Sequence, residues 1–154
     1  MNIRTANYLD IDGLKFLNKE LDSDAVLYQP EHFVMSDRTD DYFINLIDNE
    51  HTDILIAEEN DELLGFALLY IQKSKNISCL KPQSNLYIGD LCVTKKKRNC
   101  GVGTKLINAC KAYGKKQGLD FIRLQVFPLN QDGIRFYERN GFKEMMKTLE
   151  CEFS

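Results

Sequence analysis

The chain has 154 residues, of which 44% are hydrophobic, and a formal net charge of −3 at neutral pH. This size predicts a single domain, residues 1–154, with one core, and the negative charge argues against a dedicated nucleic-acid binder, which needs a basic surface. No apolar run is long enough to span a membrane and no basic-then-apolar leader is present, so a cytoplasmic location is expected. The five cysteines include no C-x-x-C pair, so neither a disulfide framework nor a metal site is expected.

The first third of the chain predicts a strand followed by two helices. Residues 2–6 alternate in the manner of a strand, and a helical apolar pattern follows, with Asp10 as its expected N-cap. This helix should end before Pro30, because the residue before a proline disfavours the α conformation. A second helix is expected to begin at Asp37 or Thr39.

Acidic residues gather in this region. Between residues 21 and 50 there are eight Asp or Glu residues and one base, Arg38. An acidic rim would concentrate a cationic amine near the surface. Ordinary solvated helix faces would give the same excess, so both interpretations stand.

The middle of the chain predicts a hairpin and then a buried strand. Residues 52–57 and 63–72 are apolar runs joined by a short polar turn, and residues 73–84 have the composition of a loop. Residues 85–93 form a nearly continuous apolar run, as expected of a central strand covered on both faces. The pair Gly89-Asp90 interrupts this run and suggests a bulge.

A glycine-rich turn follows the central strand and opens a helix that should end by Gly118. The first N–H groups of a helix lack internal partners, so Gly101 and Gly103, with Arg98 ahead and Thr104 behind, could accept a diphosphate. A tight turn alone would need the same glycines. The spacing excludes a P-loop, and the lack of a third glycine argues against a dinucleotide fingerprint.

The last third predicts a strand, a helix and a final strand. Residues 120–127 alternate as a strand, and Asn130 is placed to cap the helix that closes at Asn140-Gly141. A further strand is expected from Phe142 to near Phe153.

These motifs resemble the cofactor-binding segment of the GNAT family of acetyl-CoA-dependent N-acetyltransferases. The family pattern [RQ]-x-x-G-x-[GA], after an L-x-V-like triplet, is matched by Arg98, Gly101 and Gly103 after residues 91–93, and the resemblance continues through Asn130 and the run IRFYERNGF. It implies an α/β (α+β) domain with about four helices on a mixed, mostly antiparallel sheet of six or seven strands. It also implies acetyl-CoA as co-substrate.

The resemblance also implies roles for particular residues. The backbone of residues 91–93 would pair with the pantetheine arm, Asn130 would contact the same arm or a phosphate, and Tyr137 would serve as the catalytic acid. The expected cofactor contacts are Leu91, Cys92, Val93, Arg98, Asn99, Cys100, Gly101, Val102, Gly103, Thr104, Asn130 and Tyr137. A core aromatic is the alternative reading of Tyr137.

The general base is not marked by a motif. Asp90 is the nearest acidic candidate in sequence, with Glu58 on an adjacent strand behind it, although Asp90 could instead bond the bulge backbone.

The resemblance implies acetyl transfer to a primary amine of a small molecule or protein, and a homodimer is common among relatives. A non-catalytic acyl-CoA-binding or sensing module is the alternative, since fold does not fix function. A nucleic-acid binder has only the run Lys95–Arg98 in its favour.

Overall fold

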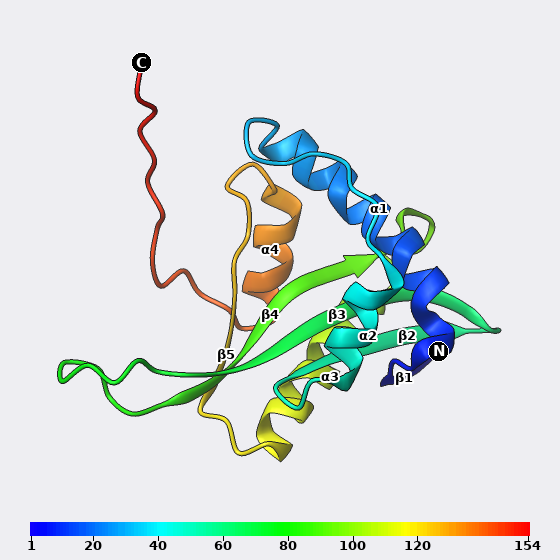
Figure 1. Cartoon of the computed structure of the whole chain (residues 1–154), viewed down its shortest axis with the longest axis horizontal. Helices are drawn as coiled ribbons and strands as arrows, with labels where there is room; N and C mark the ends of the chain where they lie inside the picture. The colour runs from blue at the N-terminus through cyan, green and yellow to red at the C-terminus, as the bar shows by residue number, and fades with distance from the viewer.

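A computed structural model describes all 154 residues. Its core is one five-stranded sheet in the order β1-β2-β3-β4-β5, antiparallel except for the parallel pair β4 and β5 (Figure 1). The strands are β1 (Asn2–Thr5), β2 (Thr52–Glu59), β3 (Glu62–Lys73), β4 (Ser84–Val93) and β5 (Phe121–Leu124). The fold is thus the single-domain α/β arrangement that the sequence predicts, with β4 inside the sheet.

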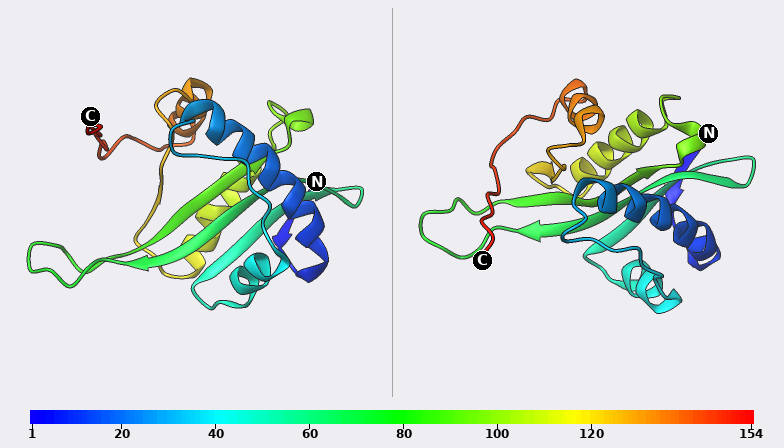
Figure 2. Two further views of the ribbon diagram at one scale, coloured as in Figure 1. Left: turned by 45° about the horizontal axis from the view of Figure 1, so that its top comes forward. Right: turned by 90° about the horizontal axis from the view of Figure 1, so that it is seen from above.

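Helices cover both faces of this sheet (Figure 2). They are α1 (Ile11–Tyr28), α2 (Asp40–Asp48), α3 (Val102–Lys116) and α4 (Gln131–Arg139), with the short 3-10 turns η1 (Tyr8–Asp10) and η2 (Lys95–Lys97). α1 and α2 lie on one face, and α3 and α4 lie on the other. The β3–β4 connection, residues 74–83, projects away from the body at the end of a long hairpin.

Each face of the sheet has its own apolar layer. Leu14 and Leu17 of α1 and Phe43 of α2 are fully buried against the first face. Ile107 and Cys110 of α3 are fully buried against the second. The sheet is covered on both sides, which accounts for the nearly continuous apolar runs of its central strands.

The N-terminal cap of α1 differs from the expected one. Asp10 makes no capping hydrogen bond to α1; its carboxylate instead accepts from the Asn7 backbone N–H at 2.8 Å and from Arg4. Asn7 is the capping residue, because its side chain accepts from Leu9 N and closes a capping box around η1. α1 ends at Tyr28, and of the two expected starts of the second helix, Asp37 and Thr39, the structure has Thr39 as the N-cap of α2.

The expected bulge in β4 is confirmed. Asp90 pairs with Leu68 and Ile88 pairs with Leu69, so Gly89 is an extra residue with no partner on β3. An added Cβ on Gly89 would lie 2.7 Å from the ring of Tyr70. The glycine therefore allows that ring to lie against the strand.

The end of the chain departs from the sequence-based expectation. No strand forms after Phe142, so the sheet has five strands rather than six or seven, and residues 143–154 run away from the body (Figure 1). β5 also ends at Leu124, three residues earlier than the alternation suggests. A strand needs a neighbour for its backbone groups, and within this chain the last residues have none.

Candidate active site

The sheet opens between β4 and β5. Their ladder runs from Asn85–Phe121 to Ile88–Leu124 and then stops, while β4 continues to Val93 with β3 as its only partner. The backbone of Leu91, Cys92 and Val93 therefore presents a free edge toward the gap. Free N–H and C=O groups on a strand edge can pair with an extended amide-bearing ligand.

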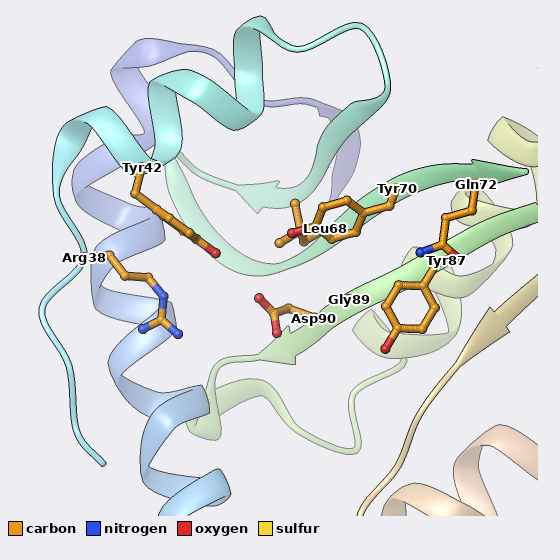
Figure 3. Close-up of a pocket in the computed structure, with 8 residues that line it drawn as sticks. All are labelled: Arg38, Tyr42, Leu68, Tyr70, Gln72, Tyr87, Gly89 and Asp90. Atoms are coloured by element: carbon orange, nitrogen blue, oxygen red, sulfur yellow. The ribbon is translucent and has the colours of Figure 1, made fainter. Parts of the chain in front are cut away.

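A pocket of about 400 Å³ lies on the α1/α2 side of this opening (Figure 3). It is lined by Arg38, Tyr42, Leu68, Tyr70, Gln72, Tyr87, Gly89 and Asp90. Tyr70 and Tyr87 are cross-strand partners with ring centroids 6.3 Å apart, and the Tyr87 hydroxyl donates to Gln125 at 3.1 Å. Three of the eight lining residues are tyrosines, and one carboxylate lies among them.

That carboxylate belongs to Asp90, directly after the bulge. Its side chain is half-buried, accepts no hydrogen bond and points into the space bounded by Tyr42 and Tyr70 (Figure 3). Burial raises the pKa of Asp90 above its ordinary value, and nearby Arg38 partly opposes this effect. The alternative that Asp90 bonds the bulge backbone is wrong, and its lone pairs are available to a ligand.

Arg38 is held at the rim of the pocket by a buried carboxylate. Its guanidinium donates to both oxygens of Asp22, at 2.7 and 2.9 Å, and its central carbon lies 5.8 Å from the centroid of the Tyr42 ring. This bidentate pair fixes the guanidinium beside Tyr42. Because Asp22 neutralises Arg38, the net charge facing a ligand comes from Asp90.

The start of α3 has no side-chain cap. Gly101 occupies the N-cap position with φ +82°, and Asn99 also has a positive φ. The first intrahelical bond is donated by Lys105, so the N–H groups of the three residues before it have no acceptor. This turn therefore presents several free amides at the positive end of a helix dipole.

Arg98 lies nearby but is already engaged. It donates to the Val93 carbonyl at 3.2 Å and to the Asp24 carboxylate at 2.8 Å, which ties the turn to the end of β4 and to α1. Arg98 therefore holds the turn in place through these two hydrogen bonds. The neighbouring Lys95–Lys97 form η2, and the N–H of Lys95 donates to Glu20.

Tyr137 lies on the α3 side of the sheet. Its ring packs edge-on against Phe136 and Phe142 and beside the α3 layer, and its hydroxyl has no hydrogen-bond partner. Burial raises the pKa of Tyr137 to about 12, so the phenol is protonated at neutral pH. The residue is half-buried and keeps a free donor.

Asn130 caps α4 as expected. Its side-chain oxygen accepts from the Gly133 N–H at 3.0 Å and from the Tyr28 hydroxyl at 3.3 Å. Its contact with a cofactor stays a prediction.

Glu58 does not lie at the pocket. Its carboxylate accepts from Arg4 at 2.8 and 2.9 Å, beside β1. Asp90 is therefore the better placed of the two candidate bases.

Sequence reasoning missed the pocket tyrosines. No motif marks Tyr42 as a pocket residue, and nothing in the sequence marks Tyr70 and Tyr87 as neighbours across a bulge. Pairing the two strands around Gly89 would have placed both rings on one face. The excess of acidic residues between positions 21 and 50 was the remaining indication of a substrate site. One of these residues, Asp22, forms an ion pair with Arg38.

No helix is long and apolar enough to cross a bilayer. The structure also groups no three His, Cys, Asp or Glu side chains where they could share a metal ion.

The glycine-rich start of α3, which carries the resemblance to acetyltransferases, lies beside the opening of the sheet. The sequence model of the Acetyltransferase (GNAT) family matches residues 18–142, so the chain belongs to this family. The chain is 34% identical over 98 residues to the uncharacterized N-acetyltransferase YhfO of Bacillus subtilis, a match covering 64% of this chain and 63% of YhfO. It is 31% identical over 103 residues to the uncharacterized N-acetyltransferase MJ1207 of Methanocaldococcus jannaschii. This match covers 67% of this chain and 44% of MJ1207. The match thus spans less than two thirds of either relative.

Solved structures share the fold. A mutant of the BH1408 protein from Bacillus halodurans superposes with a TM-score of 0.94 at 22% identity over the whole of both chains. The aminoglycoside N-acetyltransferase AAC(6')-Iy, solved in complex with CoA, superposes with a TM-score of 0.75 at 18% identity, covering 99% of both chains. At such identities the likeness concerns the fold alone.

Proposed function

We propose that this protein transfers an acetyl group from acetyl-CoA to a primary amine. The observation that carries the proposal is the free edge of β4, which lies between uncapped helix amides and a pocket with an unbonded carboxylate. A non-catalytic acyl-CoA-binding module would need the free edge of β4 and the uncapped amides of α3, but it would not need the carboxylate of Asp90.

The cofactor side is formed by the start of α3 and by β4. The free amides of Val102, Gly103 and Thr104 suit a diphosphate, and Gly101 leaves open space where a side chain would stand. The free backbone groups of Leu91 and the N–H of Val93 suit the amides of a pantetheine arm, whereas the Val93 carbonyl already accepts from Arg98. Arg98, Asn99 and Cys100 shape this turn, and Arg98 anchors it. The fold relative AAC(6')-Iy was solved with CoA, which supports the same assignment here.

The acceptor side is the tyrosine-lined pocket. Asp90 would take a proton from the ammonium form of the acceptor, because an amine attacks the thioester only as the free base. Three tyrosines around one carboxylate favour a cationic amine, since aromatic faces and a negative charge both attract it. The acceptor is a small molecule or an exposed amine of a protein.

Tyr137 would stabilise the departing thiolate by donating a hydrogen bond. Full proton transfer from a phenol of pKa about 12 to a thiolate whose acid has a pKa of about 8.5 is uphill by roughly 5 kcal/mol. Donation without transfer needs no such step and still lowers the energy of the developing charge.

The cofactor side is tested by adding negative charge at the start of α3. Thr104→Glu should weaken CoA binding by about 10-fold or more, because a carboxylate would repel the diphosphate at the free amides. Titration calorimetry with CoA measures the effect. Folding stability should not fall, since acidic residues are favourable in the first turn of a helix.

Asn108→Glu is the matched control, because it adds the same charge to an exposed position of the same helix one turn later. Release of CoA with a panel of amines then separates the two functions. Turnover with at least one cationic amine supports the enzyme, whereas tight acetyl-CoA binding without turnover on any acceptor supports the binding module. Equal CoA affinity in both variants would overturn the cofactor assignment.

A further inference from the structure

Arg38 and Asp90 carry opposite charges in the same pocket but do not pair. They are the two charged residues among those that line the pocket, and their side chains point toward the same space from opposite sides (Figure 3). Opposite charges in a partly buried space attract each other more strongly than charges at an open surface. The ion pair that Arg38 forms is with Asp22 instead. Another interaction therefore holds the guanidinium away from Asp90.

Asp22 of α1 provides that interaction. Its two carboxylate oxygens accept from Nη1 and Nη2 of Arg38 at 2.7 and 2.9 Å, and its side chain is only 10% exposed. A bidentate pair fixes the orientation of a guanidinium as well as its distance. If Arg38 turned to Asp90, Asp22 would be left as an unpaired buried charge, which is strongly unfavourable. Two carboxylates thus compete for one guanidinium, and Asp22 holds it.

The other titratable groups around Asp90 are neutral. Tyr42 faces it from α2, Tyr70 from β3 and Tyr87 from β4. Burial raises the pKa of all three phenols, so they stay protonated near neutral pH. Burial also raises the pKa of Asp90, while Arg38 lowers it and Asp22 raises it. The charges that act on Asp90 are therefore those of Arg38 and Asp22.

We propose that Asp22 is a positioning residue, which holds Arg38 at the rim of the pocket and thereby keeps the carboxylate of Asp90 free for the acceptor amine. This inference rests on the proposed function, in which Asp90 takes a proton from the acceptor. Without the charge of Asp22, Arg38 would turn to Asp90, the one carboxylate that lines the pocket. A carboxylate paired with a guanidinium is a weaker base and is closed to an ammonium ion.

The first test measures the pKa of the Asp90 carboxyl in the whole protein by carbon-13 NMR, with Asp90→Asn used to assign its signal. Asp22→Asn should lower this pKa by about 1 pH unit or more, because the released guanidinium favours the charged form. Arg38→Gln should raise it, because the cation is gone. The double variant should lie below Arg38→Gln and close to the unaltered protein, since it removes a pair with no net charge.

Kinetics give a second readout. In Asp22→Asn, kcat/KM at neutral pH should fall by about 10-fold or more, and the acidic limb of the pH–rate profile should move to lower pH, as expected of a weaker base. Adding Arg38→Gln to this variant should recover most of the lost activity. If Asp22 only braced the fold, removal of a second side chain would not repair the damage.

Asp37→Asn is the matched control. Asp37 precedes Arg38 in the chain and pairs with Lys19 of α1 at 3.1 Å, but it does not line the pocket. The pKa of Asp90 and the pH–rate profile should be unchanged in this variant.

The proposal is overturned if Asp22→Asn leaves the pKa of Asp90 unchanged or raises it. Should that variant fold poorly, Arg38→Gln and the double variant decide, and equal pKa values of Asp90 in these two would overturn the proposal. Absence of turnover with every amine would overturn the proposed function, whereas the NMR titration would still show whether Asp22 holds Arg38 away from Asp90.

Discussion

At the scale of single residues, Asp90 is unusual because it is half-buried and has no hydrogen-bond donor. Burial without a partner disfavours the charged form, which is why the pKa of this carboxyl is raised. A carboxylate kept in this state is costly for folding, and a catalytic or binding role would explain why the site contains it.

Asp90→Asn should therefore lower kcat/KM by about 10²- to 10⁴-fold, the usual contribution of a general base. Activity of the unaltered protein should fall on acidification through the raised pKa of Asp90, since the protonated acid cannot accept a proton. The variant should lose this limb of the pH–rate profile. A coupled assay of CoA release over a range of pH measures both effects.

Near neutral pH, Asp90→Asn should be more stable to unfolding than the unaltered protein. A group whose pKa is higher in the folded state contributes stability below its unfolded pKa, and this contribution is lost as pH rises through the folded pKa. Asp53→Asn is the matched control, because burial also raises the pKa of Asp53 but that residue does not line the pocket. Loss of activity in the control, or unchanged activity in Asp90→Asn, would remove Asp90 as the base.

Tyr137→Phe should lower kcat by about 10- to 100-fold, which is the value of a hydrogen bond to a charged group. The affinity for acetyl-CoA should change little, because the hydroxyl acts on charge that develops only as the thiolate leaves. Tyr113→Phe is the control, since Tyr113 is also half-buried with a pKa raised to about 12 but lies near Asp53. Steady-state kinetics distinguish kcat from KM, and an equal effect of both substitutions would contradict the assignment.

At the scale of elements, β3 and β4 approach closely in the part of β4 that lies beside the opening of the sheet. An added Cβ on Gly65 would lie 2.5 Å from the Cys92 carbonyl oxygen, in the stretch of β4 whose other edge is free. Backbone atoms cannot move aside cheaply, so Gly65 is required by the close contact of two strands.

Gly65→Ala should destabilise the protein by about 1–3 kcal/mol or more, as overpacking does in a dense core. Gly114→Ala in α3 is the control, because its Cβ would make an ordinary 3.6 Å contact with Leu86. That variant should be neutral or gain up to about 1 kcal/mol, since alanine restricts the unfolded chain and favours helix. Chemical denaturation measures the free energy of unfolding of both variants. Similar changes in the two would show that the close contact between β3 and β4 does not require glycine at position 65.

At the scale of the whole molecule, the proposed cofactor side and the proposed acceptor pocket lie on opposite faces of one sheet, beside the place where β4 separates from β5. Two substrates could therefore be bound at once. Cys92, the cysteine of β4, is buried, and burial raises its pKa to about 12. The thiol is therefore not a ready nucleophile.

Initial rates should follow a sequential pattern, with intersecting lines when both substrates are varied, because the amine would attack the thioester directly. No burst of CoA should appear without an amine. Parallel lines, together with an acetyl group found on the chain by mass spectrometry, would instead indicate a covalent intermediate.

The sequence by itself determined the local features of this protein. The helical periodicity of α1, the Thr39 and Asn130 caps, the bulge at Gly89 and the glycine-rich start of α3 all follow from short-range preferences of backbone and side chain. Such features depend on neighbours within a few residues, so one sequence suffices to predict them.

Only the tertiary structure decided which distant residues meet. Pairing of β3 with β4 brought Tyr70 beside Tyr87, and the packing of α1 engaged Arg98 with Asp24 and left Asp90 without a donor. It also decided that the last residues do not pair with β5, although their alternation predicts a strand. Strand propensity is local, but a strand forms only against a neighbour, and the choice of neighbour depends on the whole molecule.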